Sequence, residues 1–203
     1  MEAEQPSLRE RRRLQTRQEL AQAAAELFTA QGVAATTAEQ IAGRAGISLR
    51  TFYRHFRTKE EAIAPVLEIG AERWQAALRT VPVGEGWQTA VAGAVRAMLS
   101  PVGGTTEEGL ELVRDLLVAA GEDRELADVW AVVNARSERE LLAVMRERLP
   151  EAGHLTLALH SAAATAAIRV GLEAWAEGEA ADDGGHPASS LAAQAYLRLS
   201  AGL

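Results

Sequence analysis

Apolar residues recur every three or four positions through most of the chain, a spacing that predicts amphipathic helices rather than strands. The first such segment runs from about Leu14 to Gln31, and Gly32 follows where a helix commonly ends. One face of this segment is apolar and carries Leu20, Ala24, Leu27 and Phe28. Alternating β-branched runs bounded by turn residues are missing. We therefore predict an all-α protein.

Two short helices are predicted next. Thr36 and Glu39 have the spacing of a capping box, and Ser48 is placed to cap a second short helix that ends near Phe56. Gly46 lies between the two helices, where a sharp turn favours the positive φ that glycine adopts readily. Two short helices joined in this way have the arrangement of a helix-turn-helix.

The rest of the chain is predicted to be helical, with breaks at turns rich in glycine and proline. A further capping box at Thr58 and Glu61 begins a long helix toward Leu78. Later helices are expected at about 85–100, 106–121, 123–149, 155–178 and 188–201. The predicted organisation is an N-terminal three-helix domain, residues 1–60 with the helix-turn-helix at 37–56, and a C-terminal helical bundle, residues 61–203.

Charge is divided unevenly between these two domains. The net charge is −7, yet residues 1–60 carry ten Lys and Arg against seven Asp and Glu, and residues 61–203 carry 11 against 21. A basic N-terminal domain followed by an acidic C-terminal domain is typical of a protein that binds phosphate groups through one domain only. Four of these ten basic residues could form either a solvated tail or an arm that follows a DNA groove or backbone. They are Arg9, Arg11, Arg12 and Arg13.

The composition excludes several other kinds of protein. With no cysteine, the chain has no disulfides, thiolate metal sites or cysteine nucleophile. The first residues lack the apolar stretch of a signal peptide, and no run of about 18 apolar residues predicts a membrane span. We expect a cytoplasmic protein that needs no cofactor and does not enter a membrane.

The second short helix has an inner and an outer side. Phe52 and Phe56, four residues apart, mark the inner side together with Ile47. The outer side is basic and aromatic, a combination that reads DNA bases, because arginine pairs with guanine and an aromatic group meets the thymine methyl. Its residues are Arg50, Thr51, Tyr53, Arg54 and Arg57.

Hydroxyl and cationic side chains flank the two short helices, where proteins commonly meet phosphate oxygens. These residues are Thr36, Thr37, Ser48, His55 and Lys59. Each has a structural alternative. Thr36 and Thr58 could serve only as helix caps, Leu49 could be half-packed, and His55 could hydrogen-bond within the domain.

The segment AAELFTAQGVAATTAEQIAGRAGISLRTFYRHFRTKEEAI resembles the DNA-binding domain of the TetR family of regulators. It has the family's Ala-Ala-x-x-Leu-Phe helix, Thr-Thr pair, Ile-Ala-x-x-Ala-Gly, Thr-Phe-Tyr-x-His-Phe and Lys-Glu, with Ile47 where valine is commoner. The resemblance covers about residues 14–64. It implies a transcriptional regulator, by default a repressor, that binds a palindromic operator in double-stranded DNA as a homodimer and is released by a small-molecule effector.

The same resemblance implies roles for individual residues. Base contacts are expected from Leu49, Arg50, Thr51 and Tyr53, and Arg50 is expected to set sequence preference. Phosphate contacts are expected from Thr37, Ser48, His55 and Lys59.

The resemblance also implies a dimer built from the last two long helices. An apolar stripe on the penultimate helix would form the dimer interface together with Tyr196 of the last helix. The residues of the stripe are Leu157, Ala164, Ile168 and Leu172. The alternative is that the same stripe belongs to the core of a single chain.

An effector pocket is expected among the middle helices. Tryptophans would form its walls and polar side chains would lie inside it, although packing in an ordinary core is the alternative for each tryptophan. The candidates are Trp74, Trp87, Arg114, Trp130, Asn134, His160, Arg169 and Trp175. Residues 114–149 resemble, in helix layout, the effector domain of an actinobacterial subgroup that senses acyl-CoA-like ligands. The expected effector is therefore acyl-CoA-like or another apolar molecule.

Two other classes of function compete with this interpretation. An enzyme is disfavoured because His-Glu-x-x-His, a nucleophile elbow and a glycine-rich phosphate loop are all absent from the sequence. His154 and His160 are six residues apart and do not share a helical face, so we expect no metal site. A helical interaction module that has lost DNA binding is the second competitor, and activation in place of repression also stays open.

Overall fold

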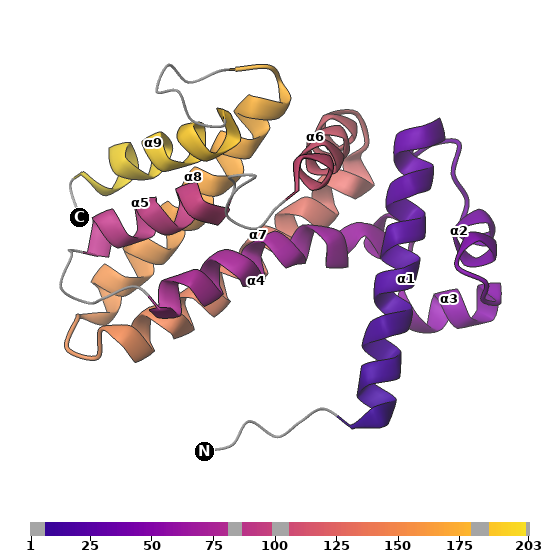
Figure 1. Cartoon of the computed structure of the whole chain (residues 1–203), viewed down its shortest axis with the longest axis horizontal. Helices are drawn as coiled ribbons and strands as arrows, with labels where there is room; N and C mark the ends of the chain where they lie inside the picture. Colours follow the sequence, from indigo (N-terminus) through magenta and orange to yellow (C-terminus); the bar gives the residue numbers. More distant parts are fainter. Residues whose placement is uncertain (1–6, 81–86, 99–105, 180–186, 202–203) are drawn as a thin grey trace. The chain divides into compact units, whose positions relative to one another are not determined.

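The computed structural model describes residues 7–80, 87–98, 106–179 and 187–201 (Figure 1). Within these ranges the only regular secondary structure is helical, which confirms the all-α prediction. The helices are α1 (Leu8–Gln31), α2 (Ala38–Arg44), α3 (Leu49–His55), the short 3-10 helix η1 (Glu60–Ile63), α4 (Ala64–Thr80), α5 (Trp87–Met98), α6 (Glu107–Glu122), α7 (Arg124–Arg148), α8 (His154–Ala176) and α9 (Pro187–Ser200). They fall into two compact units, Met1–Leu67 and Glu68–Leu203.

The N-terminal unit is organised around α1. Leu20, Ala24 and Phe28 are buried on one face of this helix, where α2 and η1 pack. α1 begins at Leu8, about six residues before the predicted start, because Ser7 and Glu10 form a capping box ahead of the apolar stripe. The sequence prediction followed apolar periodicity, which does not register a first turn made of polar residues.

In the C-terminal unit α8 packs against α9, α7 and α6, and α9 packs also on α5 (Figure 1). The α8–α9 crossing is close at Gly171, where a Cβ atom would lie 2.4 Å from the backbone nitrogen of Ala192. By length and composition α8 could cross a membrane, but half of its most apolar window is buried inside the unit, as in the core helix of a globular protein.

The stripe predicted as a dimer seam lies in the core of the single chain. Leu157, Ala164, Ile168 and Leu172 are buried there together with Tyr196. This corrects the prediction in favour of its stated alternative, because side chains covered by the chain's own helices cannot also meet a second copy.

Candidate nucleic-acid interface

The turn between α2 and α3 has the predicted geometry. Gly46 has a φ of +69°, and the amide of Ile47 donates a 2.9 Å hydrogen bond to the carbonyl of Ala42. Ala42 is almost fully buried, so α1 and α3 approach α2 closely at this point. A residue with a Cβ atom would be strained at position 46.

Two aromatic side chains hold α3 in place. Phe52 and Phe56 are buried, and their ring centroids lie 5.8 Å apart. Ser48 caps the helix, since its hydroxyl accepts a hydrogen bond from the amide of Thr51, as predicted. The Ser48 hydroxyl also forms a 2.9 Å hydrogen bond with the hydroxyl of Thr51. The buried side and the cap fix which residues α3 presents to solvent.

The solvent-facing side of α3 is basic and aromatic. Arg50, Tyr53 and Arg54 are exposed, Tyr53 by 55%, and their spacing of three and four residues places them on one helical face. Leu49 and Thr51 are half-buried at its edges. We define Arg50, Tyr53 and Arg54 as the recognition face. Guanidinium and phenol groups together can bind bases and phosphates.

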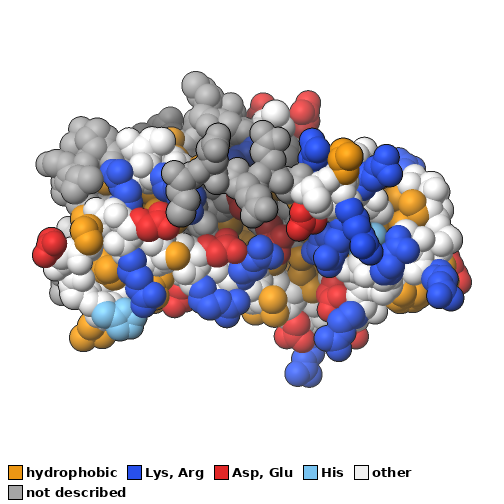
Figure 2. Space-filling model, turned by 90° about the horizontal axis from the view of Figure 1, so that it is seen from below, with side chains coloured by type: hydrophobic (Ala, Val, Ile, Leu, Met, Phe, Trp, Pro, Cys, Tyr) orange, Lys and Arg blue, Asp and Glu red, His pale blue; other side chains and the backbone are white. Residues whose placement is uncertain are grey.

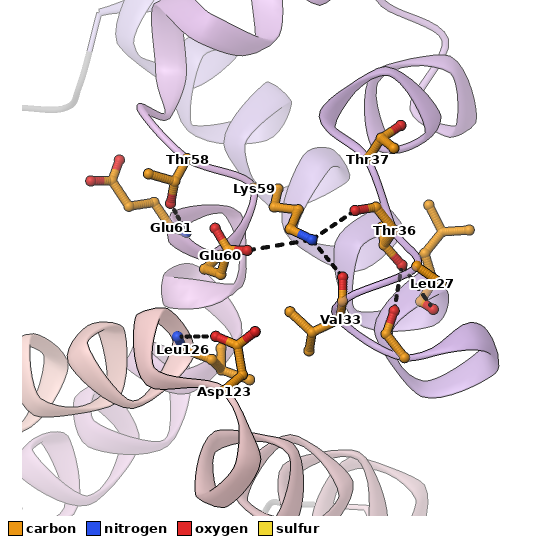
Figure 3. Close-up of polar contacts among 12 residues, drawn as sticks. Leu27, Val33, Thr36, Thr37, Thr58, Lys59, Glu60, Glu61, Asp123 and Leu126 are labelled. Atoms are coloured by element: carbon orange, nitrogen blue, oxygen red, sulfur yellow. Dashed lines mark hydrogen bonds and ion pairs between the residues drawn. The ribbon is translucent and has the colours of Figure 1, made fainter.

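Lys59 is directed into the N-terminal unit (Figure 3). Its ammonium donates hydrogen bonds to the carbonyls of Val33, at 2.6 Å, and Thr36, at 2.9 Å, and lies 3.6 Å from the carboxylate of Glu60. The lysine therefore ties η1 to the turn that precedes α2. This internal role differs from the phosphate contact that the resemblance implied.

The predicted capping box was displaced by one residue. Thr37, not Thr36, caps α2, and its partner is Gln40 rather than Glu39. Thr36 is only 1% exposed, and its hydroxyl donates to the carbonyl of Gly32. The prediction of Thr36 as a DNA contact is therefore wrong, whereas the exposed Thr37 stays available.

His55, at the end of α3, is half-buried, and its Nδ1 has no hydrogen-bond partner among the described residues. Burial lowers the pKa of His55, and the positive charges of Arg54, Arg17 and Arg13 lower it further. The ring is therefore held neutral, which removes the charge that a phosphate contact would use.

Sequence reasoning missed Arg17. Its guanidinium lies 4.7 Å from the centroid of the Phe56 ring, and its Nη1 donates to the carbonyl of His55 at 3.3 Å. Arg17 thus fixes the end of α3 to α1. Its place one turn before Leu20, on the side of α1 that carries the apolar stripe, was the signal available in the sequence.

The four N-terminal arginines belong to a helix. Arg9, Arg11, Arg12 and Arg13 all lie within α1 and are exposed. They do not form a separate tail, because the Ser7 cap begins the helix ahead of them, and their contact with a DNA groove or backbone stays a prediction.

Some of the candidate effector residues form one polar group. In it, the Trp130 indole donates to the Glu173 carboxylate at 2.9 Å, and Arg169 pairs with the same carboxylate at 2.7 Å. Asn134 donates to the backbone carbonyl of Trp130. In this group the polar atoms bind one another.

The other candidates do not join this group: His160 is buried in the core, whereas Arg114 is exposed. Tyr196 and the Nδ1 of His160 are 3.4 Å apart, and burial lowers the pKa of His160. The Arg114 guanidinium lies 5.8 Å from the Trp175 ring centroid. The remaining two candidates, Trp74 and Trp87, have side chains outside the described part of the structure.

A hollow between α4 and α7 includes none of the eight candidates. It is lined by Glu68, Ala71, Glu72, Val133, Arg136, Ser137 and Glu140. Arg136 pairs with the carboxylates of Glu68 and Glu140 there. This hollow is therefore not the predicted effector pocket, which stays a prediction.

A helix-turn-helix that presents an exposed basic face, followed in the chain by a larger helical unit, defines a DNA-binding protein of the two-domain helical type. The family model described as bacterial regulatory proteins, tetR family, matches residues 20–63. TcmR, an HTH-type transcriptional regulator of Streptomyces glaucescens, is 45% identical over 107 residues, which are 52% of this chain and 47% of TcmR. The N-terminal unit is therefore similar to the DNA-binding domain of the tetR family of bacterial regulators.

Solved structures of the family have the same fold. A TetR transcriptional regulator from Rhodococcus sp. RHA1 superposes with a TM-score of 0.61 at 18% identity, over 94% of this chain and 98% of that one. The repressor AlkX of Dietzia sp. strain DQ12-45-1b superposes with a TM-score of 0.60 at 16% identity, over 90% of this chain and 94% of AlkX. The matched region spans less than half the length of each curated relative. Those relatives are named as transcriptional regulators, not enzymes.

Proposed function

We propose that the protein is a transcriptional repressor that binds an operator in double-stranded DNA through α3. The observation that carries this proposal is the recognition face, where Arg50, Tyr53 and Arg54 share one exposed side of a helix. The buried Phe52 and the Ser48 cap prevent that helix from turning. Arginine reaches guanine in the major groove in two hydrogen bonds, so Arg50 would set sequence preference.

A binding titration tests this function. The probe is a duplex from the intergenic region upstream of the protein's own gene, with a mixed-sequence duplex as competitor. We expect saturable binding that the competitor does not displace. Arg50→Ala should weaken it about 5- to 150-fold, since one bidentate base contact contributes about 1–3 kcal/mol. Arg139→Ala, at an exposed site on α7, removes the same charge and is the control. Equal affinity for both duplexes would instead favour a helical protein that does not read sequence.

The proposed operator is a palindrome read by a homodimer. Since the apolar stripe is buried, we assign the seam to the exposed apolar residues on the other side of α8, which are Leu155, Leu159 and Val170. At 100° per residue these three lie within about 60° of one another. Two-fold pairing would place the two recognition helices about 34–36 Å apart, one turn of DNA.

Sedimentation tests the seam. Leu159→Glu should convert a dimer to a monomer, because it introduces a charge into an apolar contact. Val132→Glu places the same charge on α7 at a residue that is 67% exposed, and should leave the dimer intact. A Leu159→Glu protein that still sediments as a dimer would overturn this assignment.

The proposed effector is a small, largely apolar molecule, acyl-CoA-like or simpler, bound in the C-terminal unit. Support comes from the aromatic side chain of Trp175 and the cationic Arg114, 5.8 Å from its ring centroid, a pair that suits an apolar ligand with an anionic end. Binding would favour a conformation that holds the operator less tightly. A palmitoyl-CoA titration that changes neither tryptophan fluorescence nor operator affinity would exclude that ligand class.

A further inference from the structure

Two arginines of α1 lie near the last turn of α3, at the edge of the recognition face. We define the α1–α3 arginine cluster as Arg13, Arg17 and Arg54. Its position is set by Arg17, whose Nη1 donates to the His55 carbonyl at 3.3 Å. Arg13 precedes Arg17 by one turn on the same face of α1, and Arg54 precedes His55 on α3.

Arg17 contacts the backbone of His55 directly, and Arg13 and Arg54 carry charge near the same residue. The positive charges of Arg54, Arg17 and Arg13 all act on His55, and together with its burial they lower the pKa of its ring. Arg13 and Arg54 are exposed, and neither pairs with a carboxylate among the described residues. Figure 2 shows Lys and Arg side chains gathered over the N-terminal unit, on the right of that view. The cluster therefore holds positive charge that the chain itself does not neutralise.

Arg17 has a different task from its two neighbours. The last carbonyl groups of a helix carry partial negative charge, which would repel a phosphate approaching the end of α3. Arg17 covers this end, because it donates to the His55 carbonyl and lies over the Phe56 ring. With the helix end covered, Arg13 and Arg54 are left free to bind an anion.

We propose that Arg13 and Arg54 bind a phosphate of the DNA backbone, so that α1 extends the protein–DNA contact beyond the helix-turn-helix. The recognition face supports this ligand, because Arg54 belongs to both surfaces and a duplex seated on Arg50 and Tyr53 continues toward the cluster. Guanidinium pairs suit phosphate oxygens. This inference rests on the proposed function, and it names a contact that is independent of base sequence.

Salt dependence of DNA binding measures this contact. The logarithm of the affinity for duplex DNA falls with the logarithm of salt concentration by about 0.9 for each phosphate neutralised. The probe is a mixed-sequence duplex of about 40 base pairs, long enough to cover two half-sites about one turn apart, titrated between about 50 and 200 mM NaCl. Arg13→Ala and Arg54→Ala should each lower the slope, by at most about one per bound protomer, because the two side chains share one phosphate.

Arg11→Ala is the matched control. Arg11 is exposed on the same helix and carries the same charge, but two residues along a helix turn it to another side from Arg13. Its substitution should leave the slope of the wild-type protein unchanged. Equal slopes for Arg13→Ala and Arg11→Ala would overturn the proposed contact.

This result is separable from the test of the proposed function. Loss of preference for the upstream duplex over the mixed-sequence duplex would overturn the sequence-specific function, while the slope difference between Arg13→Ala and Arg11→Ala reports only the phosphate contact. Failure of the wild-type protein to bind any duplex at low salt would overturn both.

Discussion

The guanidinium of Arg17 lies over the ring of Phe56, 4.7 Å from its centroid, and joins the first helix of the chain to the end of the recognition helix. The two residues are 39 positions apart in the sequence. Because α3 has only seven residues, its orientation depends on such contacts more than on its own hydrogen bonds.

We expect Arg17→Ala to lower the free energy of unfolding by about 1–2 kcal/mol, since it removes a cation–π contact and a charged hydrogen bond. Urea denaturation followed by circular dichroism measures this change. Arg12→Ala, on an exposed part of α1, should alter stability by less than about 0.5 kcal/mol. Equal losses for both variants would show that Arg17 contributes only helix surface charge.

Lys59→Met should destabilise the N-terminal unit by about 2–3 kcal/mol. The substitution keeps the length and much of the apolar character of the side chain, but leaves the carbonyls of Val33 and Thr36 without their donor. Thermal unfolding provides the measurement. If stability were unchanged and the salt dependence of DNA binding fell instead, Lys59 would be a phosphate contact after all.

Gly171→Ala should lower the free energy of unfolding by about 1–3 kcal/mol, because the added Cβ would overlap the backbone of Ala192 and force α8 away from α9. Gly93→Ala is the matched control, in helix α5, where an added Cβ meets nothing within 4 Å. That change should be neutral or stabilise by up to about 1 kcal/mol, because alanine favours a helix. Similar losses in the two variants would contradict the close α8–α9 crossing.

Stability should decrease as the pH falls below about 6.5, the ordinary pKa of histidine, because burial and nearby arginines lower the pKa of His55 in the folded chain. Over that range the unfolded chain binds a proton that the folded chain does not, and the effect ends once pH reaches the lower, folded pKa. His55→Gln should reduce this pH dependence of stability. Part of it should persist, because burial also lowers the pKa of His160. Urea titrations at several pH values test the difference, and identical profiles for the two proteins would refute it.

The elements were predictable where a local pattern determines them. Apolar periodicity located the helices, and Gly46 and Ser48 located the turn and cap of the helix-turn-helix. The cap of α2 was misplaced because Thr36 and Thr37 can both accept the hydrogen bond, and each has a Glu or Gln three residues on. Local sequence does not decide which hydroxyl turns inward.

Contacts between distant segments were not predictable in the same way. The apolar stripe from Leu157 to Leu172 has the same sequence pattern whether it packs against a second chain or within its own chain. Only the packing of α9 on α8 shows that the stripe belongs to the core of the single chain. Lys59 was misassigned for a similar reason. A cation beside a helix start suits phosphate and backbone carbonyls equally until the fold places Val33 within 2.6 Å.

The internal bonds of Lys59 also bear on how the DNA-facing charge can be regulated. Lys59 is the single lysine of the chain, and its amine is already hydrogen-bonded to two carbonyls, while every other basic side chain apart from histidine is arginine. Acetylation neutralises lysine amines, whereas arginine keeps its charge at all physiological pH values. Lysine acetylation therefore cannot remove charge from the arginines that the proposed function places against DNA.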